Sequence, residues 1–201
     1  MPEKKRKPDQ LGWDSTGMSP LARAHYEKYI RWLKDDMSDI SATPLVVLVW
    51  GPGESGGDLF VKRGQIKDML IKHGDVALFS EHLDEVCSGF AGSARAKELI
   101  QAHRADFIVV IYGSPGSIAE VHDFGGFLKV LGSKMLVFVD SRHTEGYGYS
   151  GLLSELKAEF NNVQTYKYPE DIHECHLMGD VDKKLAKLRL AKWWAGQLRG
   201  A

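Results

Sequence analysis

The sequence has few cysteines and no long apolar run. Cys87 and Cys175 are too few for a disulfide framework and fit a reducing compartment. The longest apolar runs, at 45–50 and 107–112, are far shorter than the roughly 20 residues that a membrane helix needs. No N-terminal segment has the pattern of a signal peptide. These absences predict a soluble cytoplasmic protein without a membrane partner.

The sequence also lacks an excess of charge of one sign. Its 26 Lys and Arg face 27 Asp and Glu, a formal net charge of −1. No global field therefore favours nucleic acid or an anionic membrane. The basic run Lys4–Lys7 lies in a polar tail, residues 1–18, and is more typical of a solvated tail than of a nucleic-acid patch.

What is present is an alternation of strand and helix signals. Apolar, β-branched runs predict strands at 45–50, 76–79, 107–111, 134–140 and 163–168. Helical spacing predicts helices at 19–36, 59–73, 93–103, from 117, at 151–160 and at 180–198. This order predicts one Rossmann-like three-layer α/β domain, residues 19–201 with its core at 45–168. We expect about five parallel strands with helices on both faces, an extra N-terminal helix packed outside, and a basic amphipathic C-terminal helix.

The stretch from Asp106 to Phe127 organises the chain. An apolar strand runs into the small residues Gly113-Ser114-Pro115-Gly116-Ser117, after which a helix can begin with Ser117 as its N-cap. Glu120 follows at the capping-box spacing. Glu120 therefore either caps the helix only, or projects into a cleft at the carboxyl edge of the sheet. In the second interpretation it faces a sugar whose phosphate rests on residues 113–117.

Other residues follow strands at the same edge. The Gly-rich turn 51–57 matches neither the dinucleotide fingerprint nor the Walker pattern, so it is weak evidence by itself. Arg63 lies near a helix start, where it opposes the helix dipole; it either meets a phosphate or faces solvent. Glu81 and His82 come directly after the second strand and are candidates for the site.

Three further features leave alternatives open. The loop 141–151 carries Tyr147 and Tyr149, which either stack on a base as part of a lid or belong to a plain crossover. His173, Cys175 and His176 are close in sequence, but no second ligand cluster appears, so we expect no metal site. The apolar residues of the last helix close the core or, less favoured, bind a membrane or acidic partner; exposed tryptophans leave room for self-association.

Residues 105–110 followed by Ser117-Ile118-Ala119-Glu120 resemble the nucleoside 2-deoxyribosyltransferase pattern, in which an apolar strand leads to Gly-Thr-x-x-Glu. Ser114 to Glu120 is more similar to the deoxyribosyltransferase-like effectors of bacterial retron defence systems, which have Ser-Pro-Gly-Ser-x-x-Glu. The resemblance spans about 45–192. Two departures stand out. Ser114 stands where the transferases have an Asp. The winged-helix-like domain of the retron effectors is not in this sequence, and for this reason we expect another defence system or a separate partner chain.

The resemblance implies an N-glycosidase that cleaves the base–sugar bond of a nucleotide, nucleoside or NAD in defence against phage. NAD would then be a substrate, and no cofactor is expected. Glu120 is the implied catalytic carboxylate. The implied partners are the small-molecule substrate, a second copy in a homo-oligomer, and a separate regulatory protein or nucleoprotein. The residues expected to bind substrate are Gly51, Gly53 and Asp58 on one wall, Arg63, Glu81 towards the ribose, Gly113, Ser114, Gly116 and Ser117 under a phosphate or hydroxyl, and Tyr147 or Tyr149 over the base.

Two other functions use the same loop. A non-catalytic nucleotide sensor would bind a nucleotide in this cleft and change its oligomeric state. A phosphoribohydrolase of the lysine-decarboxylase-like group shares a Gly-Thr-x-x-Glu loop, but that group has Pro-Gly-Gly before it, where this sequence has the shorter Pro115-Gly116. Because one loop serves all three, the fold alone does not separate them.

Overall fold

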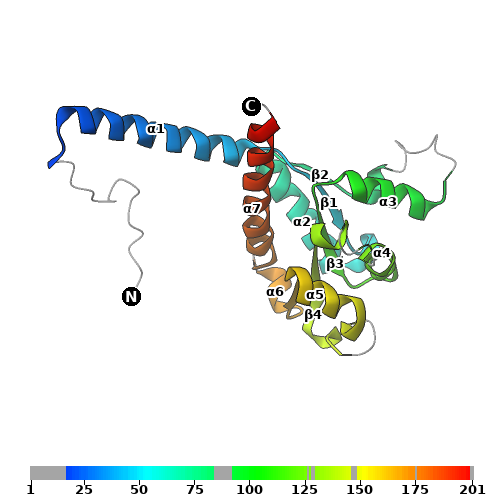
Figure 1. Ribbon diagram of the computed structural model, residues 1–201. Coiled ribbons are helices and arrows are strands. Elements are labelled where there is room, and N and C mark those ends of the chain that lie inside the picture. The colour runs from blue at the N-terminus through cyan, green and yellow to red at the C-terminus, as the bar shows by residue number, and fades with distance from the viewer. Residues whose placement is uncertain are drawn as a thin grey trace, which may run out of the picture. The chain divides into compact units, whose positions relative to one another are not determined.

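A computed structural model describes residues 17–83, 92–125, 127, 130–145, 149–174 and 176–199 of the chain (Figure 1). The chain divides into two compact units, with the boundary between Ser41 and Ala42. The domain expected from residue 19 onwards is thus divided after its first helix.

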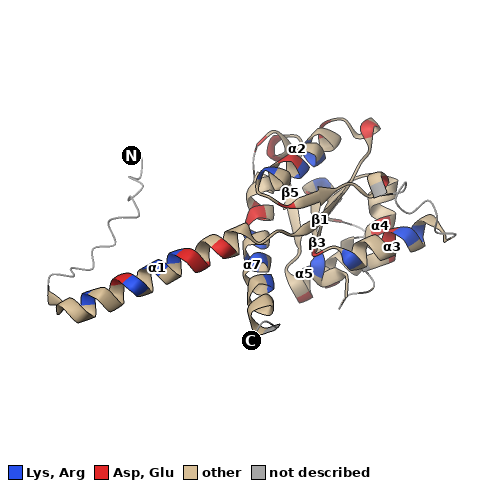
Figure 2. Cartoon of the chain, turned by 90° about the horizontal axis from the view of Figure 1, so that it is seen from above, with Lys and Arg blue, Asp and Glu red and all other residues tan. Residues whose placement is uncertain are grey.

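The first unit contains all but the last residue of the helix α1, Pro20–Ala42. Ser19 caps it by accepting a hydrogen bond from the Ala22 amide at 3.3 Å, so the start indicated by Ser19-Pro20 is confirmed. The helix runs past the expected end at 36, because the next strong breaker is Pro44, which disfavours helical backbone at the residue before it. None of its residues is buried, and its packing on the fold stays a prediction. Charged side chains are spread along it (Figure 2).

The second unit is built on a five-stranded, all-parallel sheet, which confirms the predicted fold class. Its strand order is β2-β1-β3-β4-β5. β3 is central and fully buried, as a strand covered on both faces must be. The strands are β1 Val46–Trp50, β2 Val76–Leu78, β3 Phe107–Tyr112, β4 Met135–Asp140 and β5 Val163–Tyr166.

Helices cover both faces of this sheet (Figures 1 and 2). Alternate strand residues point to opposite faces. Val47, Val49 and Ile111 pack in one hydrophobic cluster with residues of α2, α6 and α7, whereas Leu48, Trp50 and Val110 pack in another with residues of α3, α4 and α5. These helices are α2 Asp58–Lys72, α3 Ala94–Arg104, α4 Pro115–Gly125, α5 Ser154–Phe160, α6 Glu170–His173 and α7 His176–Arg199.

Short helical turns connect the larger elements. They are η3 Glu54–Gly56, η4 Ser80–Leu83, η5 Gly132–Lys134, η6 Ser141–His143 and η7 Tyr149–Leu153. The sequence did not predict them, and η7 replaces the first residues of the helix expected at 151–160.

Two other boundaries near the C-terminus were predicted wrongly. The fifth strand ends at Tyr166 instead of 168, close to Pro169, which has no amide hydrogen for a sheet ladder. The short helix α6 was not expected, and α7 begins at His176 instead of about 180. In the described chain, no helix combines the length and apolarity that crossing a membrane requires.

The helix α7 closes the core, as the favoured interpretation of its apolar residues predicted. Val181 and Leu185 are fully buried against the sheet, whereas Trp194 is exposed. Its basic residues also fasten it to the domain: Arg189 pairs with buried Asp75, and Lys192 bonds Asp106 at 2.7 Å.

Candidate functional site

The strand order creates a switch point at the carboxyl edge of the sheet. The chain passes from β1 outward to β2, and then returns to β3 on the other side of β1. The loops that leave β1 and β3 therefore diverge, and such crevices are where open α/β sheets bind ligands. The predicted loops 51–57 and 113–117 both lie here, because they directly follow these two strands.

The N-terminus of α4 is held by two serines. Ser114 Oγ accepts a hydrogen bond from the Ser117 amide at 3.2 Å. In return, Ser117 Oγ accepts from the Gly113 amide at 3.2 Å and the Ser114 amide at 3.0 Å. Ser114 is thus the N-cap and Ser117 the residue that reaches back to it. The predicted N-cap at Ser117 is wrong, because Pro115 takes the first helical position.

This arrangement limits how the loop can hold an anion. The amides of Gly113 and Ser117 already donate to serine oxygens, and Ser117 is 1% exposed. Gly116 lies at the second position of α4, where an amide has no acceptor within its own helix. Substrate contacts of Gly113, Ser114, Gly116 and Ser117 stay predictions, and the structure gives the two serines a role in positioning α4.

Glu120 lies beyond the capping positions, one and a half turns into α4. The interpretation that it only caps the helix is therefore wrong. Its side chain is half-buried, and burial raises its pKa from the ordinary 4.5 to about 8. The negative charges of Glu98 and Glu81 raise the pKa further, while the positive charge of Arg63 partly lowers it. Glu120 thus lies within electrostatic reach of residues from α2, η4 and α3.

Arg63 is the buried centre of this group, at 2% exposure. Its Nε donates to the Val49 carbonyl at 2.9 Å, at the carboxyl end of β1. Its two terminal nitrogens donate to both carboxylate oxygens of Glu81, at 2.8 and 2.7 Å, and its guanidinium lies 4.1 Å from the centre of the Phe79 ring. The solvent-facing interpretation is wrong, and no phosphate is needed to pair this charge, because Glu81 supplies the partner.

The surroundings of Glu81 and Glu120 shift the pKa values of the two carboxyl groups in opposite directions. Burial alone would raise the pKa of Glu81, but the hydrogen bonds from Arg63 outweigh it and hold that pKa below the usual range. Glu81 therefore stays ionised near neutral pH, while Glu120 holds its proton until about pH 8. Two neighbouring carboxyl groups with separated pKa values are typical of sites that handle protons. Glu81 is 47% exposed and can accept further hydrogen bonds.

The loop after β1 depends on glycine for its close packing. A Cβ atom on Gly51 would lie 3.2 Å from the Ile111 Cβ and 3.4 Å from the Arg63 Cδ. On Gly56 it would lie 2.3 Å from the Pro52 Cβ, too close for any side chain. Gly53 is exposed, with open space at its Cβ position. Gly51 therefore lets β1, β3 and Arg63 meet at the switch point, and Gly56 lets the loop fold closely against Pro52.

A hollow of about 200 Å³ lies over the carboxyl ends of β3, β4 and β5. Buried Asp140 accepts a hydrogen bond from the Arg142 Nε at 2.9 Å, and the Arg142 guanidinium lies 4.9 Å from the centre of the Tyr168 ring. The Tyr168 hydroxyl donates to Asp58 at 3.2 Å, so the predicted wall residue Asp58 borders this side. The lining residues are Gly56, Leu59, Tyr112, Gly113, Asp140, Arg142, His143, Tyr166 and Tyr168.

Of the residues that line this hollow, the sequence predicted only Gly113 as a site residue, and the polar residues that it missed include Asp140, Arg142, Tyr166 and Tyr168. A usable signal was present. Asp140 ends β4 and Tyr166 ends β5, so both lie at the ligand-binding edge by the argument that selected Glu81.

The remaining predicted residues are less central. Tyr147 falls outside the described residues. Tyr149 is half-buried in η7, where it packs against the cluster under α4 and α5 and its hydroxyl lies 3.5 Å from Lys157 Nζ. Its role over a base stays a prediction. His82 is exposed, with its ring centre 5.2 Å from that of Phe79.

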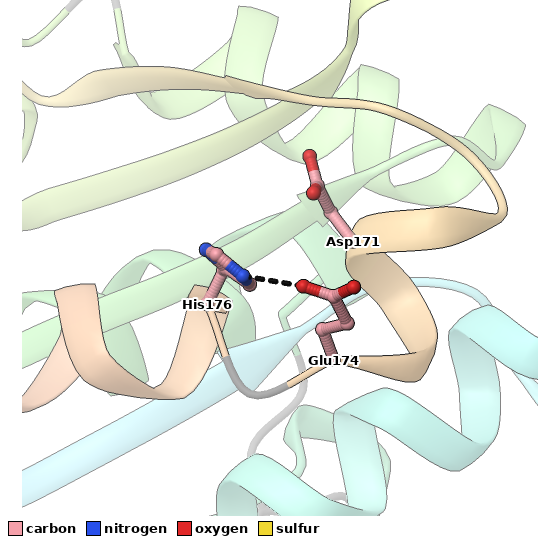
Figure 3. A group of neighbouring side chains, drawn as sticks. All are labelled: Asp171, Glu174 and His176. Atoms are coloured by element: carbon pink, nitrogen blue, oxygen red, sulfur yellow. Dashed lines mark ion pairs between the residues drawn. The ribbon is translucent and has the colours of Figure 1, made fainter. Parts of the chain in front are cut away.

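Within the described ranges, one group of side chains has ligand atoms that converge as a metal site requires. Asp171, Glu174 and His176 bring one such atom each to within 4.8 Å of one another (Figure 3). His176 lies 2.5 Å from Glu174, and both are more than half exposed. His173, considered with His176 in the sequence, instead faces Asp58 at 3.8 Å, and Cys175 lies outside the described residues. Glu174 is paired with His176 at the α6–α7 junction, and Asp171 accepts a hydrogen bond from the Lys167 amide at 2.7 Å.

Comparison with protein-family models and with curated proteins gives no match. The likeness of residues 105–120 to the deoxyribosyltransferase pattern therefore stays an expectation, and the site has to be judged on its geometry and chemistry.

Proposed function

We propose that this protein cleaves the N-glycosidic bond of a nucleoside, nucleotide or NAD, with Glu120 as the catalytic carboxylate. One observation carries the proposal: at the switch point, a half-buried carboxyl group with a pKa of about 8 lies within electrostatic reach of an ionised Arg63–Glu81 pair. Carboxyl groups with strongly shifted pKa values cluster at catalytic sites. Burying such a group lowers the stability of the protein, but its shifted pKa is useful for catalysis.

The electrostatics of this cluster suit glycosidic cleavage. When the bond between the base nitrogen and the sugar C1′ breaks, its electron pair leaves with the base, and the sugar becomes oxocarbenium-like. Ionised Glu120 stabilises that positive charge or attacks C1′. Water then supplies the hydroxyl of the free sugar, and its proton goes to the base. Glu98 and Glu81 add negative potential at the same place.

The same charges restrict where a phosphate can lie. With Glu120 ionised, three carboxylates outnumber the one guanidinium of Arg63, so an anion next to Glu120 is repelled. The substrate would therefore place its ribose and base at Glu120. A phosphate would lie farther off, towards the Gly116 amide or Arg142, which is exposed at the edge of the hollow over β3, β4 and β5.

The test is release of free base from NAD, nucleotides and nucleosides, separated by chromatography. Glu120→Gln keeps the size of the side chain but cannot ionise, so base release should fall at least about 100-fold, as when a stabilising group is removed from a transition state. Glu159→Gln, on the exposed surface of α5, is the matched control and should keep full activity. Equal rates in the Glu120→Gln variant would refute the assignment.

A non-catalytic nucleotide sensor is the second candidate. It is favoured by the hollow over the carboxyl ends of β3, β4 and β5. Glu120 is not among the lining residues of this hollow, so a ligand can be held there without meeting the carboxyl group. Nucleotide binding by calorimetry, without base release over hours and unchanged by Glu120→Gln, is the result expected of a sensor. The setting in phage defence, with a separate regulatory partner, comes from the resemblance of residues 114–120 alone.

A further inference from the structure

The helix α1 carries an apolar stripe that is not buried. Tyr26, Ile30, Leu33, Met37 and Ile40 follow one another at spacings of four, three, four and three residues. This is the repeat that places side chains along one seam of a paired helix. Met37 is 67% exposed, and neither it nor any other residue of the helix is buried.

An isolated helix gains little from such a stripe. Most helices are stabilised by packing an apolar face, and exposed apolar patches mark places where another surface binds. The 23 residues of α1 extend over about 35 Å at 1.5 Å per residue. This length gives five side chains of the seam room to contact a partner helix.

The charges on α1 indicate which partner. Its N-terminal half is basic on balance, with Arg23, Lys28 and Arg31 against Glu27. Its C-terminal half is acidic on balance, with Asp35, Asp36 and Asp39 against Lys34 (Figure 2). The helix has no acidic residue in its first turn and no basic residue in its last. Basic charge near the N-terminus and acidic charge near the C-terminus oppose the helix dipole. This distribution is therefore unfavourable for a helix alone.

We propose that α1 pairs in antiparallel orientation with α1 of a second copy of this chain. Antiparallel pairing places the basic half of each helix against the acidic half of the other, whereas parallel pairing would align like charges. Two copies of one surface then complement each other around a two-fold axis.

The repeat also fixes the register. In antiparallel pairs the two seam positions of the heptad face each other, so Ile30 packs on Leu33 of the second copy and Tyr26 packs on Met37 of the second copy. Glu27 borders the seam next to Ile30 and then lies close to Lys34 of the second copy. The two-fold axis produces this ion pair twice.

Sedimentation of the full chain over a range of concentrations tests the pairing. The mass should rise from 22.4 kDa towards twice that value as concentration increases. Ile30→Ala with Leu33→Ala keeps a strong helix former at both positions but truncates the central layers. We expect this to raise the dissociation constant at least about 100-fold, because pairing then buries less apolar surface.

Trp32→Ala is the matched control, because Trp32 is 55% exposed and lies off the stripe beside Lys28 of its own helix. Its removal should leave the dimer unchanged. A single species of 22.4 kDa at every concentration, or a dimer that tolerates the double alanine variant, would overturn the proposal. A monomer that the same variant destabilises would show that the stripe packs on its own chain.

Charge exchange tests the orientation. Glu27→Lys and Lys34→Glu should each weaken an antiparallel dimer, because each creates like-charged neighbours, and the double exchange should restore it. In a parallel pair Glu27 would lie near Ala22 and Lys34 near Tyr29 of the other helix. A double exchange that fails to rescue the single ones would therefore exclude the antiparallel arrangement.

Discussion

At the scale of single residues, the site depends on how Arg63 distributes its hydrogen bonds. Its Nε holds the end of β1 through Val49, and its remaining donors hold Glu81. Glu120 receives only the longer-range charge of Arg63, which is too weak to offset its burial and the nearby Glu98. One arginine therefore keeps one carboxyl group ionised and leaves another protonated near neutral pH.

A change in stability with pH follows from the pKa of Glu120. Between its unfolded value of 4.5 and its folded value of about 8, the folded protein holds a proton that the unfolded chain has lost. Stability contributed by this group is complete below pH 4.5 and is lost as pH rises through 8. Glu120→Gln imitates the protonated form. It should therefore raise the free energy of unfolding by on the order of 2 kcal/mol at pH 8.5.

At pH 4 the same substitution should have no effect, because Glu120 is protonated in both states. Urea denaturation of both proteins at the two pH values measures the difference. A Gln variant that is less stable at pH 8.5 would show that burial does not strain the ionised Glu120.

The pH dependence of base release tests the charge state in which Glu120 acts. If the ionised carboxylate reacts, kcat/KM should rise with pH and level off above about 8, since this ratio follows the free protein. Glu98→Gln removes a negative charge that raises the pKa of Glu120, so the inflection should move to lower pH. An inflection that stays in place would mean that another group titrates. A rate that falls above pH 8 would make Glu120 a proton donor.

At the scale of elements, the placement of α4 was the main error in the sequence interpretation. Ser114-Pro115 repeats the signal of Ser19-Pro20, which correctly marked the start of α1. The later serine at 117 offered a capping box with Glu120, and two overlapping signals cannot be separated by spacing alone. Proline at the first helical position decides between them, because its fixed φ suits that position. This start matters for the site, because Glu120 then lies beyond the capping positions of α4.

The two serines of this N-terminus should differ in their effect on stability. Ser117→Ala removes the buried hydroxyl that accepts two part-buried hydrogen bonds, from the amides of Gly113 and Ser114, which should cost about 1–3 kcal/mol. Ser93→Ala is the control, because Ser93 caps α3 by one exposed bond to Ala96, and its loss should cost about 1 kcal/mol or less. Thermal unfolding of both variants provides the comparison. Equal losses would show that Ser117 does no more than an ordinary cap.

At the scale of the whole molecule, the sheet could be predicted because buried parallel strands are continuous apolar runs. If the strands are parallel, the residues after their carboxyl ends must lie at one edge of the sheet. The sequence therefore predicted that Glu120, Glu81 and Gly51 lie at the same edge. The pairing of Arg63 with Glu81 could not be predicted, because it joins residues 18 apart through tertiary packing. The position of Asp140 and Arg142 at this edge could be predicted in the same way, because they follow or end β4. Their pairing with each other could be seen only in the structure.

The opposite edge of the sheet, away from the site, is fastened by two similar acids. Asp75 accepts a hydrogen bond from the Leu45 amide and pairs with Arg189 of α7. Asp106 accepts from the Val46 amide and pairs with Lys192 of α7. The Asp75 side chain is fully buried, whereas that of Asp106 is 30% exposed. α7 is thus tied to the starts of β1, β2 and β3.

These two acids separate stability from chemistry. Asp75→Asn leaves the buried guanidinium of Arg189 without its counter-charge and should lower the free energy of unfolding by about 3–5 kcal/mol. Asp106→Asn breaks a more exposed pair and should cost about 1 kcal/mol or less. Because both lie at the amino edge of the sheet, base release per folded molecule should be unchanged in either variant. Denaturant unfolding together with the base-release rate measures both effects. A lower rate in a folded Asp75→Asn variant would show that the two edges are linked through the sheet. Loss of activity in Glu120→Gln would then not be enough, by itself, to locate the chemistry at the carboxyl edge.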